Sequence, residues 1–279
     1  MGKPVILVEN LFSAVAFPDH TVTAEEEATG QDVWHIADGR RRDDDLWTPT
    51  TANSATWVEV LCDRVRSADM IVLDRGHNLD GYEILLQCSN DNFTTTETVF
   101  TVTLPAVSTP GDLDDTLGVQ TEEGAWVKRF DIRSALYWRL YVSAMGASLL
   151  PEVVGLWLGK SLELEYLSDP FDDDSDDMIV QTVETPAGWT GTGQAANRRA
   201  GELRIVAANP VGYDLLRYHL QGHYGAGRPM WIVFDQENAS NAVLAKRPPG
   251  RMGFAFGGDP SWGWRAGTIA WQEHEPAQL

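Results

Sequence analysis

The sequence predicts a mainly β protein with two separate all-β cores. Between Trp34 and Ser89, short β-rich runs recur at about ten-residue spacing and are divided by Gly, Asn and Asp, which are turn residues. Segment 137–143 alternates as a half-buried strand does. Only the stretch after Asn209 has helix-start chemistry, because Asn caps helices and Pro210 suits the first helical position. We therefore expect a β-sandwich followed by a second β-rich domain with one helix.

The first expected domain covers residues 34–159 and follows a leading segment, residues 1–33, that holds one short strand and an acidic connection. Its strands are predicted from β-branched and aromatic runs bounded by Gly, Asn, Asp or Pro. They cover 57–61, 70–73, 82–88, 97–104, 125–130, 137–143 and 155–159.

The second expected domain covers residues 160–279 and opens with a different amino-acid composition. Six aspartates fall between Asp169 and Asp177, and we interpret this run as a solvated linker whose charges repel each other. A helix is expected near 210–221, with Gly222 as its end. Further strands are expected at 201–206, 230–235, 251–257 and 267–272.

Charge and hydropathy exclude several classes of partner. The formal net charge is −20, from 21 basic and 41 acidic residues, which disfavours nucleic acid because DNA affinity depends on Lys and Arg. The basic triplet Arg40–Arg42 is followed at once by Asp43–Asp45, so we interpret it as a self-compensating loop. No apolar run approaches the roughly 20 residues that cross a bilayer, and we expect no membrane insertion. The N-terminus lacks a full signal-peptide core, so synthesis in a reducing cytosol is expected.

The chain has two cysteines, Cys62 and Cys88, both among apolar strand residues. Two reduced core thiols are the favoured interpretation, and a disulfide is the alternative.

The order of the first-domain strands resembles the discoidin, or galactose-binding-like, jelly roll. The resemblance rests on Leu46-Trp47-Thr48, on the strand Trp57-Val58-Glu59-Val60, on Ser89-Asn90-Asp91 and on the late strand Tyr137–Ser143. It implies a discoidin-like jelly-roll β-sandwich that binds rather than reacts.

The second half resembles tail-tip and distal-tail structural proteins of long-tailed bacteriophages. The resemblance rests on a strand, a helix ending in Gly, and the segment Gly225–Asp235, which reads Gly-Ala-Gly-Arg-Pro-Met-Trp-Ile-Val-Phe-Asp. It implies a hub or ring domain, other tail or baseplate proteins as partners, and a homo-oligomeric ring, a hexamer in the distal-tail relatives.

A glycan site is predicted from four residues, Trp47, Arg75, His77 and Asn78. Arg, His and Asn hydrogen-bond hydroxyl groups, and Trp stacks on pyranose faces. The alternative is structural: Asp74–Gly81 is good turn sequence in which Asn78 bonds its own backbone and His77 is packed. In discoidin-like domains the Trp that matches Trp47 more commonly packs in the core or at the rim.

No catalytic or metal constellation stands out, so we expect no enzyme, no cofactor and no metal. His219 and His223 have i, i+4 spacing, but Gly222 is expected to end the helix and no Glu adjoins His219. The run Asp172–Asp177 could supply oxygens to Ca²⁺, yet it lacks the Gly and distal Glu of an EF-hand loop.

The leading functional hypothesis is therefore a structural component of a phage tail tip or baseplate, located in the virion tail and assembled in the host cytoplasm. Protein interfaces would hold it, and sandwich turns would contact host-surface glycans. The alternative is a stand-alone lectin-like protein or the non-catalytic module of a glycan-active system. A hydrolase is the third class and lacks an acid–base or nucleophilic set.

Overall fold

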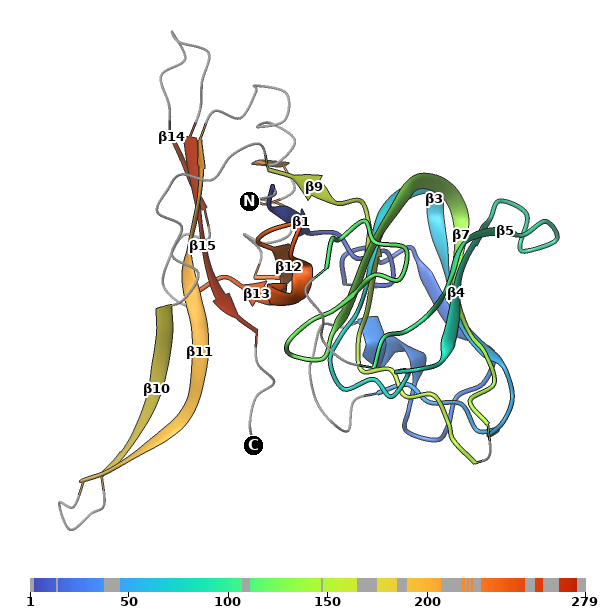
Figure 1. Ribbon diagram of the computed structural model, residues 1–279, viewed down its shortest axis with the longest axis horizontal. Coiled ribbons are helices and arrows are strands. Elements are labelled where there is room, and N and C mark those ends of the chain that lie inside the picture. The colour runs from blue at the N-terminus through green and yellow to red at the C-terminus, as the bar shows by residue number, and fades with distance from the viewer. Residues whose placement is uncertain are drawn as a thin grey trace, which may run out of the picture. The chain divides into compact units, whose positions relative to one another are not determined.

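The computed structural model confirms the predicted mainly β class and contains two compact units (Figure 1). The first comprises Met1–Glu163 with Met230–Val243, and the second comprises Leu164–Pro229 with Leu244–Glu275. The structure describes the following residues: 3–13, 15–37, 46–106, 111–146, 148–164, 175–184, 190–206, 217, 218, 220, 222, 227–248, 254–257 and 266–274. Side chains are described throughout these ranges except in 175–198, 204–206, 254–257 and 266.

The first unit contains a two-layer antiparallel sandwich. The first layer has the order β2-β3-β7-β4-β5. The second layer consists of other parts of β3 and β7, with β8 paired to β3 and β6 paired to β7. The strands are β2 (Thr21–Ala24), β3 (Thr56–Leu73), β4 (Glu83–Ser89), β5 (Glu97–Thr103), β6 (Val119–Gln120), β7 (Trp126–Val142) and β8 (Leu156–Gly159).

Two long strands, β3 and β7, contribute to both layers. Their ladder is interrupted between the Leu61 and Arg66 pairs and again between the Ala68 and Met70 pairs. Such irregularities bend a strand and increase its twist, and both strands curve strongly in Figure 1. Residues 56–61 therefore pair within the first layer, whereas Met70–Leu73 pair with β8 in the second. The predicted strands at 57–61 and 70–73 are two halves of one strand.

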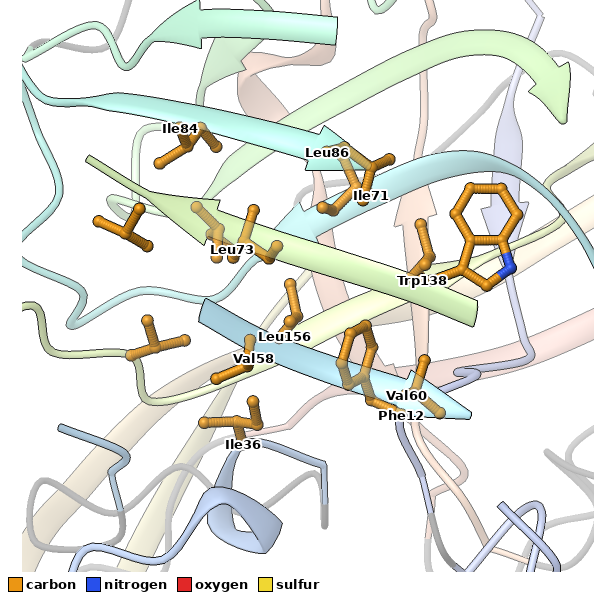
Figure 2. Close-up of a cluster of buried hydrophobic side chains, with 14 of the residues drawn as sticks. Phe12, Ile36, Val58, Val60, Ile71, Leu73, Ile84, Leu86, Trp138 and Leu156 are labelled. Atoms are coloured by element: carbon orange, nitrogen blue, oxygen red, sulfur yellow. The ribbon is translucent and has the colours of Figure 1, made fainter. Parts of the chain in front are cut away.

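The sandwich core is built from alternating side chains of both layers. Val58 and Val60 of β3, Ile84 and Leu86 of β4, and Trp138 of β7 are all fully buried. They pack in one cluster with second-layer residues Ile71, Leu73, Leu156 and Leu158 (Figure 2). Burial of each such side chain contributes about 1.5–3 kcal/mol, so this interior fixes which strand face points inward.

The outer face of the second layer is also buried. Met70, Val72 and Val127 are inaccessible to solvent, although they alternate with residues of the main core. The antiparallel neighbours β1 (Val5–Leu7), β9 (Leu162–Glu163) and β12 (Met230–Val233), which are strands of the other sheet, belong to the same unit. Gly159 of β8 packs against the backbone just after β1, where an added Cβ would collide with the Glu9 carbonyl oxygen. The first layer therefore provides the open face of the sandwich.

Two segments depart from the predicted boundaries. The leading segment supplies β1, which pairs with β12 from beyond residue 160. The 3-10 helix η3 (Ala239–Asn241) is also in the first unit, where the Ser240 carbonyl accepts the N–H of Glu122 at 2.9 Å. The pairing of β1 with β12 joins residues more than 220 positions apart, and local sequence pattern carries no information about such a partner.

The second unit is β-rich. β10 (Ser175–Glu184) pairs with β11 (Thr190–Val206), which pairs with β15 (Ala266–Glu273). β13 (Val243–Lys246) and β14 (Phe254–Gly257) also pair with β15.

The predicted helix near 210–221 falls mostly outside the described residues, of which Arg217 and Tyr218 are helical. Residues 172–174 of the acidic run Asp172–Asp177 also lie outside the described residues. Its last residues start β10, with Asp176 and Asp177 in register with Arg199 and Arg198. That end of the run is a strand rather than the linker expected, because pairing with β11 orders its backbone.

The predicted reduced thiols are confirmed, since Cys62 and Cys88 are free and buried. Desolvation raises the pKa of Cys62 to about 12 and that of Cys88 to about 11. Within the described part of the chain, no helix is long and apolar enough to cross a membrane. The Arg40–Asp45 loop lies outside the described residues.

Candidate functional site: the open face of the sandwich

Three of the four predicted glycan-binding residues, Arg75, His77 and Asn78, lie together in the turn between β3 and β4. Each of them contacts other groups of the protein there. The His77 side chain is buried, and its Nδ1 accepts the N–H of Leu79 at 3.3 Å. Desolvation lowers the pKa of His77, against the opposing effects of Asp80 and Asp74. The Arg75 guanidinium lies 3.6 Å from the Glu123 carboxylate. This arrangement fits the turn interpretation of the segment.

Asn78 connects this turn to the loop before β8. Its side-chain nitrogen donates to the Leu150 carbonyl at 2.9 Å, and its side-chain oxygen accepts the N–H of Glu152 at 2.8 Å. Both ends of the amide are therefore engaged with backbone groups. A glycan would have to displace these bonds to use Asn78.

Trp47 requires a correction of its predicted role. The whole residue is inaccessible to solvent, and its indole N–H donates to the Glu26 carbonyl at 3.0 Å. Its backbone forms an antiparallel bridge with Val153. Because both ring faces are covered, Trp47 cannot stack on a sugar, and it acts as a core residue. Trp47 and Asn78 both form hydrogen bonds with the segment Leu150–Val153, and these bonds hold that segment in place.

A different set of side chains lies on the open face of the first layer. Alternation points Val58 and Val60 inward and so places Trp57 and Glu59 outward. Arg139 of β7 is in register with Glu59 of β3 on one side and with Gln87 of β4 on the other. Tyr141 of β7 is likewise in register with Trp57 of β3 and with Leu85 of β4. Tyr137 lies two residues before Arg139 on the same face. We name as the platform five of these outward residues and Phe93, which lies in the loop between β4 and β5 and contacts Arg139: Trp57, Glu59, Phe93, Tyr137, Arg139 and Tyr141.

Arg139 is the centre of the platform. Its guanidinium carbon lies 3.7 Å from the centre of the Phe93 ring and 4.5 Å from that of Trp57, which are cation–π distances. Glu59 Oε2 accepts hydrogen bonds from Arg139 Nε at 3.2 Å and from Nη2 at 2.8 Å. The guanidinium is thus fixed in orientation by two rings and one carboxylate.

The ion pair leaves hydrogen-bonding capacity on both partners. Among the described residues, no protein group hydrogen-bonds to Glu59 Oε1 or to Arg139 Nη1. The pair therefore offers a ligand one unbonded acceptor, Glu59 Oε1, and one unbonded donor group, Arg139 Nη1. Hydroxyl groups can use either of them, because a hydroxyl both donates and accepts.

Phe93 reaches the platform from the loop between β4 and β5 through an unusual backbone. Asn92 and Phe93 have φ values of 55° and 56°, a region that bulky residues rarely adopt. The loop is held by Asp91, whose carboxylate accepts the Thr95 N–H at 2.9 Å and the Ser89 hydroxyl at 2.7 Å. The bonds from Thr95 and Ser89 also lower the pKa of Asp91. The fold thus holds an unfavourable conformation that places an aromatic ring on Arg139.

The platform combines aromatic rings with one ion pair. Its one carboxylate is paired with Arg139, and no group of three metal-ligating side chains occurs in the described part of the chain. Aromatic rings and fixed hydrogen-bonding groups instead suit a ligand with both apolar faces and hydroxyls.

The sequence contained a signal for this face. Segments 57–61 and 137–143 were both predicted as strands, the second from its alternation, and outward positions of both hold aromatic or charged residues. The predicted glycan site was chosen mainly from turn residues, so three of its four residues lie in the turn 74–81 rather than on the strands of the open face.

Comparisons with known structures find carbohydrate-binding modules. Chitosan-binding module 1 of a chitosanase/glucanase from Paenibacillus sp. IK-5 is 19% identical, with a TM-score of 0.39, over 54% of this chain and 98% of the module. A module of Clostridium perfringens, CpGH89CBM32-5, in complex with GalNAc-β-1,3-galactose, is 10% identical, with a TM-score of 0.39, over 51% and 96%. CBM32-3 of a family 31 glycoside hydrolase from the same organism is 16% identical, with a TM-score of 0.38, over 51% and 91%. The sequence matches no protein-family model, and no curated protein matches it.

Proposed function

We propose that this chain is a non-catalytic glycan-binding protein whose platform contacts the sugar. The observation that carries the proposal is the fixed Arg139 guanidinium, held between Phe93 and Trp57 and bonded to Glu59 on an open sheet face. Aromatic rings offer apolar area to the C–H faces of a sugar, and the Glu59–Arg139 pair offers an acceptor and a donor to its hydroxyls.

Orientation before binding supports the proposal. Affinity for a flexible, strongly hydrated ligand is limited by the cost of ordering the groups that meet it. Here the ordering has already occurred, because Arg139 has only 20% and Glu59 only 10% of its side chain exposed. The strained Phe93 backbone is a further fixed element, and its cost is met by folding rather than by binding.

A glycan microarray tests this proposal with a matched pair of tryptophan variants. Trp57→Ala removes a platform ring, whereas Trp34→Ala removes a tryptophan that is 49% exposed and lies outside the platform. We expect wild type and Trp34→Ala to bind the same glycans and Trp57→Ala to lose them. Binding that is unchanged in Trp57→Ala, or wild type that binds no glycan, would contradict the proposal.

A second candidate function is the structural role in a phage tail tip or baseplate, with the virion tail as its location. The observation in its favour is the long β10–β11 ladder, in which β10 pairs with β11 alone among the described strands. A strand with one unpaired edge can accept a strand from another subunit. A homo-oligomeric ring would then form through such edges, together with other tail proteins.

Native mass spectrometry of the full chain distinguishes this candidate. A ring component is expected to give one closed oligomer, a hexamer if the likeness to distal-tail proteins extends to assembly. A monomer at micromolar concentration would contradict self-assembly and leave the glycan-binding proposal unaffected.

A further inference from the structure

We infer that the platform takes an unbranched, neutral glycan that lies across the strands; this inference rests on the proposed function. Four polar side chains form one row perpendicular to the strands. Thr23 of β2 is in register with Glu59, Glu59 with Arg139, and Arg139 with Gln87 of β4. The row crosses three strand spacings, or about 14 Å, which exceeds the length of one sugar ring.

The row has aromatic side chains along both sides. Trp57 and Tyr141, a register pair, lie on one side, and Tyr137 lies on the other. Phe93 contacts Tyr137 edge-on, with 6.1 Å between ring centres. A linear chain can keep its hydroxyls over the polar row and its C–H groups near these rings. A branch would project sideways into an aromatic flank, where its hydroxyls would lose water without gaining partners.

Charge favours a neutral ligand. Glu59 neutralises Arg139 through a 2.8 Å contact, so the centre of the row has no net charge. The chain as a whole carries a formal charge of −20, which repels polyanions such as uronate or sulfated glycans. The hydrogen-bonding groups that remain, including the hydroxyl of Thr23 and the amide of Gln87, are uncharged.

Isothermal titration calorimetry with oligosaccharide ladders tests the inference on the full chain. The probes are neutral linear series (cello-, malto-, chito- and galacto-oligosaccharides) from monosaccharide to hexasaccharide, branched neutral counterparts, and oligogalacturonates. We expect the affinity for one neutral linear series to rise with length and then level off, with weaker binding of branched and acidic probes.

The two proposals fail in different ways in this experiment. Binding that is as tight for a monosaccharide as for longer probes, or tighter for branched or acidic probes, overturns the inference and leaves glycan binding standing. An absence of binding to every series, together with an empty microarray, overturns the proposed function and the inference with it.

Variants at the ends of the row add a second readout. Thr23→Val and Gln87→Leu keep side-chain size while removing hydrogen-bonding groups. Each should weaken binding of the longest bound probe by between about twofold and tenfold. Thr21→Val is the matched control, because Thr21 is on the same face of β2 but in register with Leu61. Loss of affinity in Thr21→Val equal to that in Thr23→Val would overturn the assignment of the row.

Discussion

The guanidinium of Arg139 donates two hydrogen bonds to one oxygen of the Glu59 carboxylate, from register positions directly opposite each other on adjacent strands. Glu59 has only 10% of its side chain exposed, so it depends on this partner to compensate its lost hydration. The pair therefore contributes to the stability of the sheet as well as to the platform.

Arg139→Gln is expected to lower the free energy of unfolding by about 1–3 kcal/mol, because it leaves the Glu59 carboxylate mostly buried without its partner. The double variant Glu59→Gln/Arg139→Gln should cost less than the sum of the single variants. Urea denaturation of all four proteins measures this coupling.

Arg66→Gln is the matched control for Arg139→Gln. Arg66 has the same kind of surroundings, a carboxylate in Asp63 and a ring in Phe17, but it lies outside the platform. Both variants should affect stability, and only Arg139→Gln should abolish glycan binding. Equal binding by the two variants would refute the assignment of Arg139.

Phe93→Gly should separate stability from binding. Glycine adopts positive φ without steric cost, so relief of backbone strain offsets part of the lost ring contact. We expect the unfolding free energy to change by no more than about 1 kcal/mol, whereas glycan affinity falls at least tenfold. Unchanged affinity in calorimetric titration would show that the Phe93 ring is not part of the site.

Trp47→Ala should act on stability alone. Removal of a fully buried tryptophan leaves a cavity and an unpaired Glu26 carbonyl, so a loss of about 3–5 kcal/mol is expected in chemical denaturation. Trp47→Phe, which fills most of the cavity, should fold and bind glycans as wild type does. Specific loss of binding in stable Trp47→Phe would restore the role predicted from sequence.

The buried thiols predict a decline in stability at alkaline pH. Cys62 and Cys88 have folded pKa values of about 12 and 11 against an ordinary 9.0. Above pH 9 the unfolded chain loses thiol protons that the folded chain retains, so the stability present below pH 9 falls as pH rises. Cys62 alone contributes at most about 1.4 kcal/mol per pH unit to this slope.

Urea denaturation between pH 8 and pH 10.5 measures the slope. The double variant Cys62→Ala/Cys88→Ala should be less stable at pH 8 but show a shallower decline. An identical slope in the two proteins would mean that the thiols ionise equally in the folded and unfolded chains.

Much of the fold was predictable from local pattern. The alternation of Tyr137–Ser143 and the turn chemistry of Asp74–Gly81 marked strands and turns that the structure contains. The partner of β1 was not predictable, because the run Val5–Leu7 carries no information about Met230–Val233. Nor could alternation show that β3 and β7 each run through two layers.

The site was harder to predict because Trp47 and Trp57 look alike in sequence. Both stand beside β-branched or polar neighbours, and only tertiary packing buries the first and places the second on the open face. Alternation identified which residues share a face with Arg139, but both faces of the first layer carry large aromatic residues. Which face meets solvent depends on the long-range packing of the second layer.

Hydrogen–deuterium exchange of the full chain, with and without the tightest-binding glycan from the microarray, locates the surface that binds the sugar. We expect new protection in 56–61, 89–96 and 137–142, the segments that bear the platform. Protection in the turn 74–81 and the loop 148–153 instead, with the platform segments unchanged, would refute the platform as the binding surface and place the sugar at the residues first predicted from sequence.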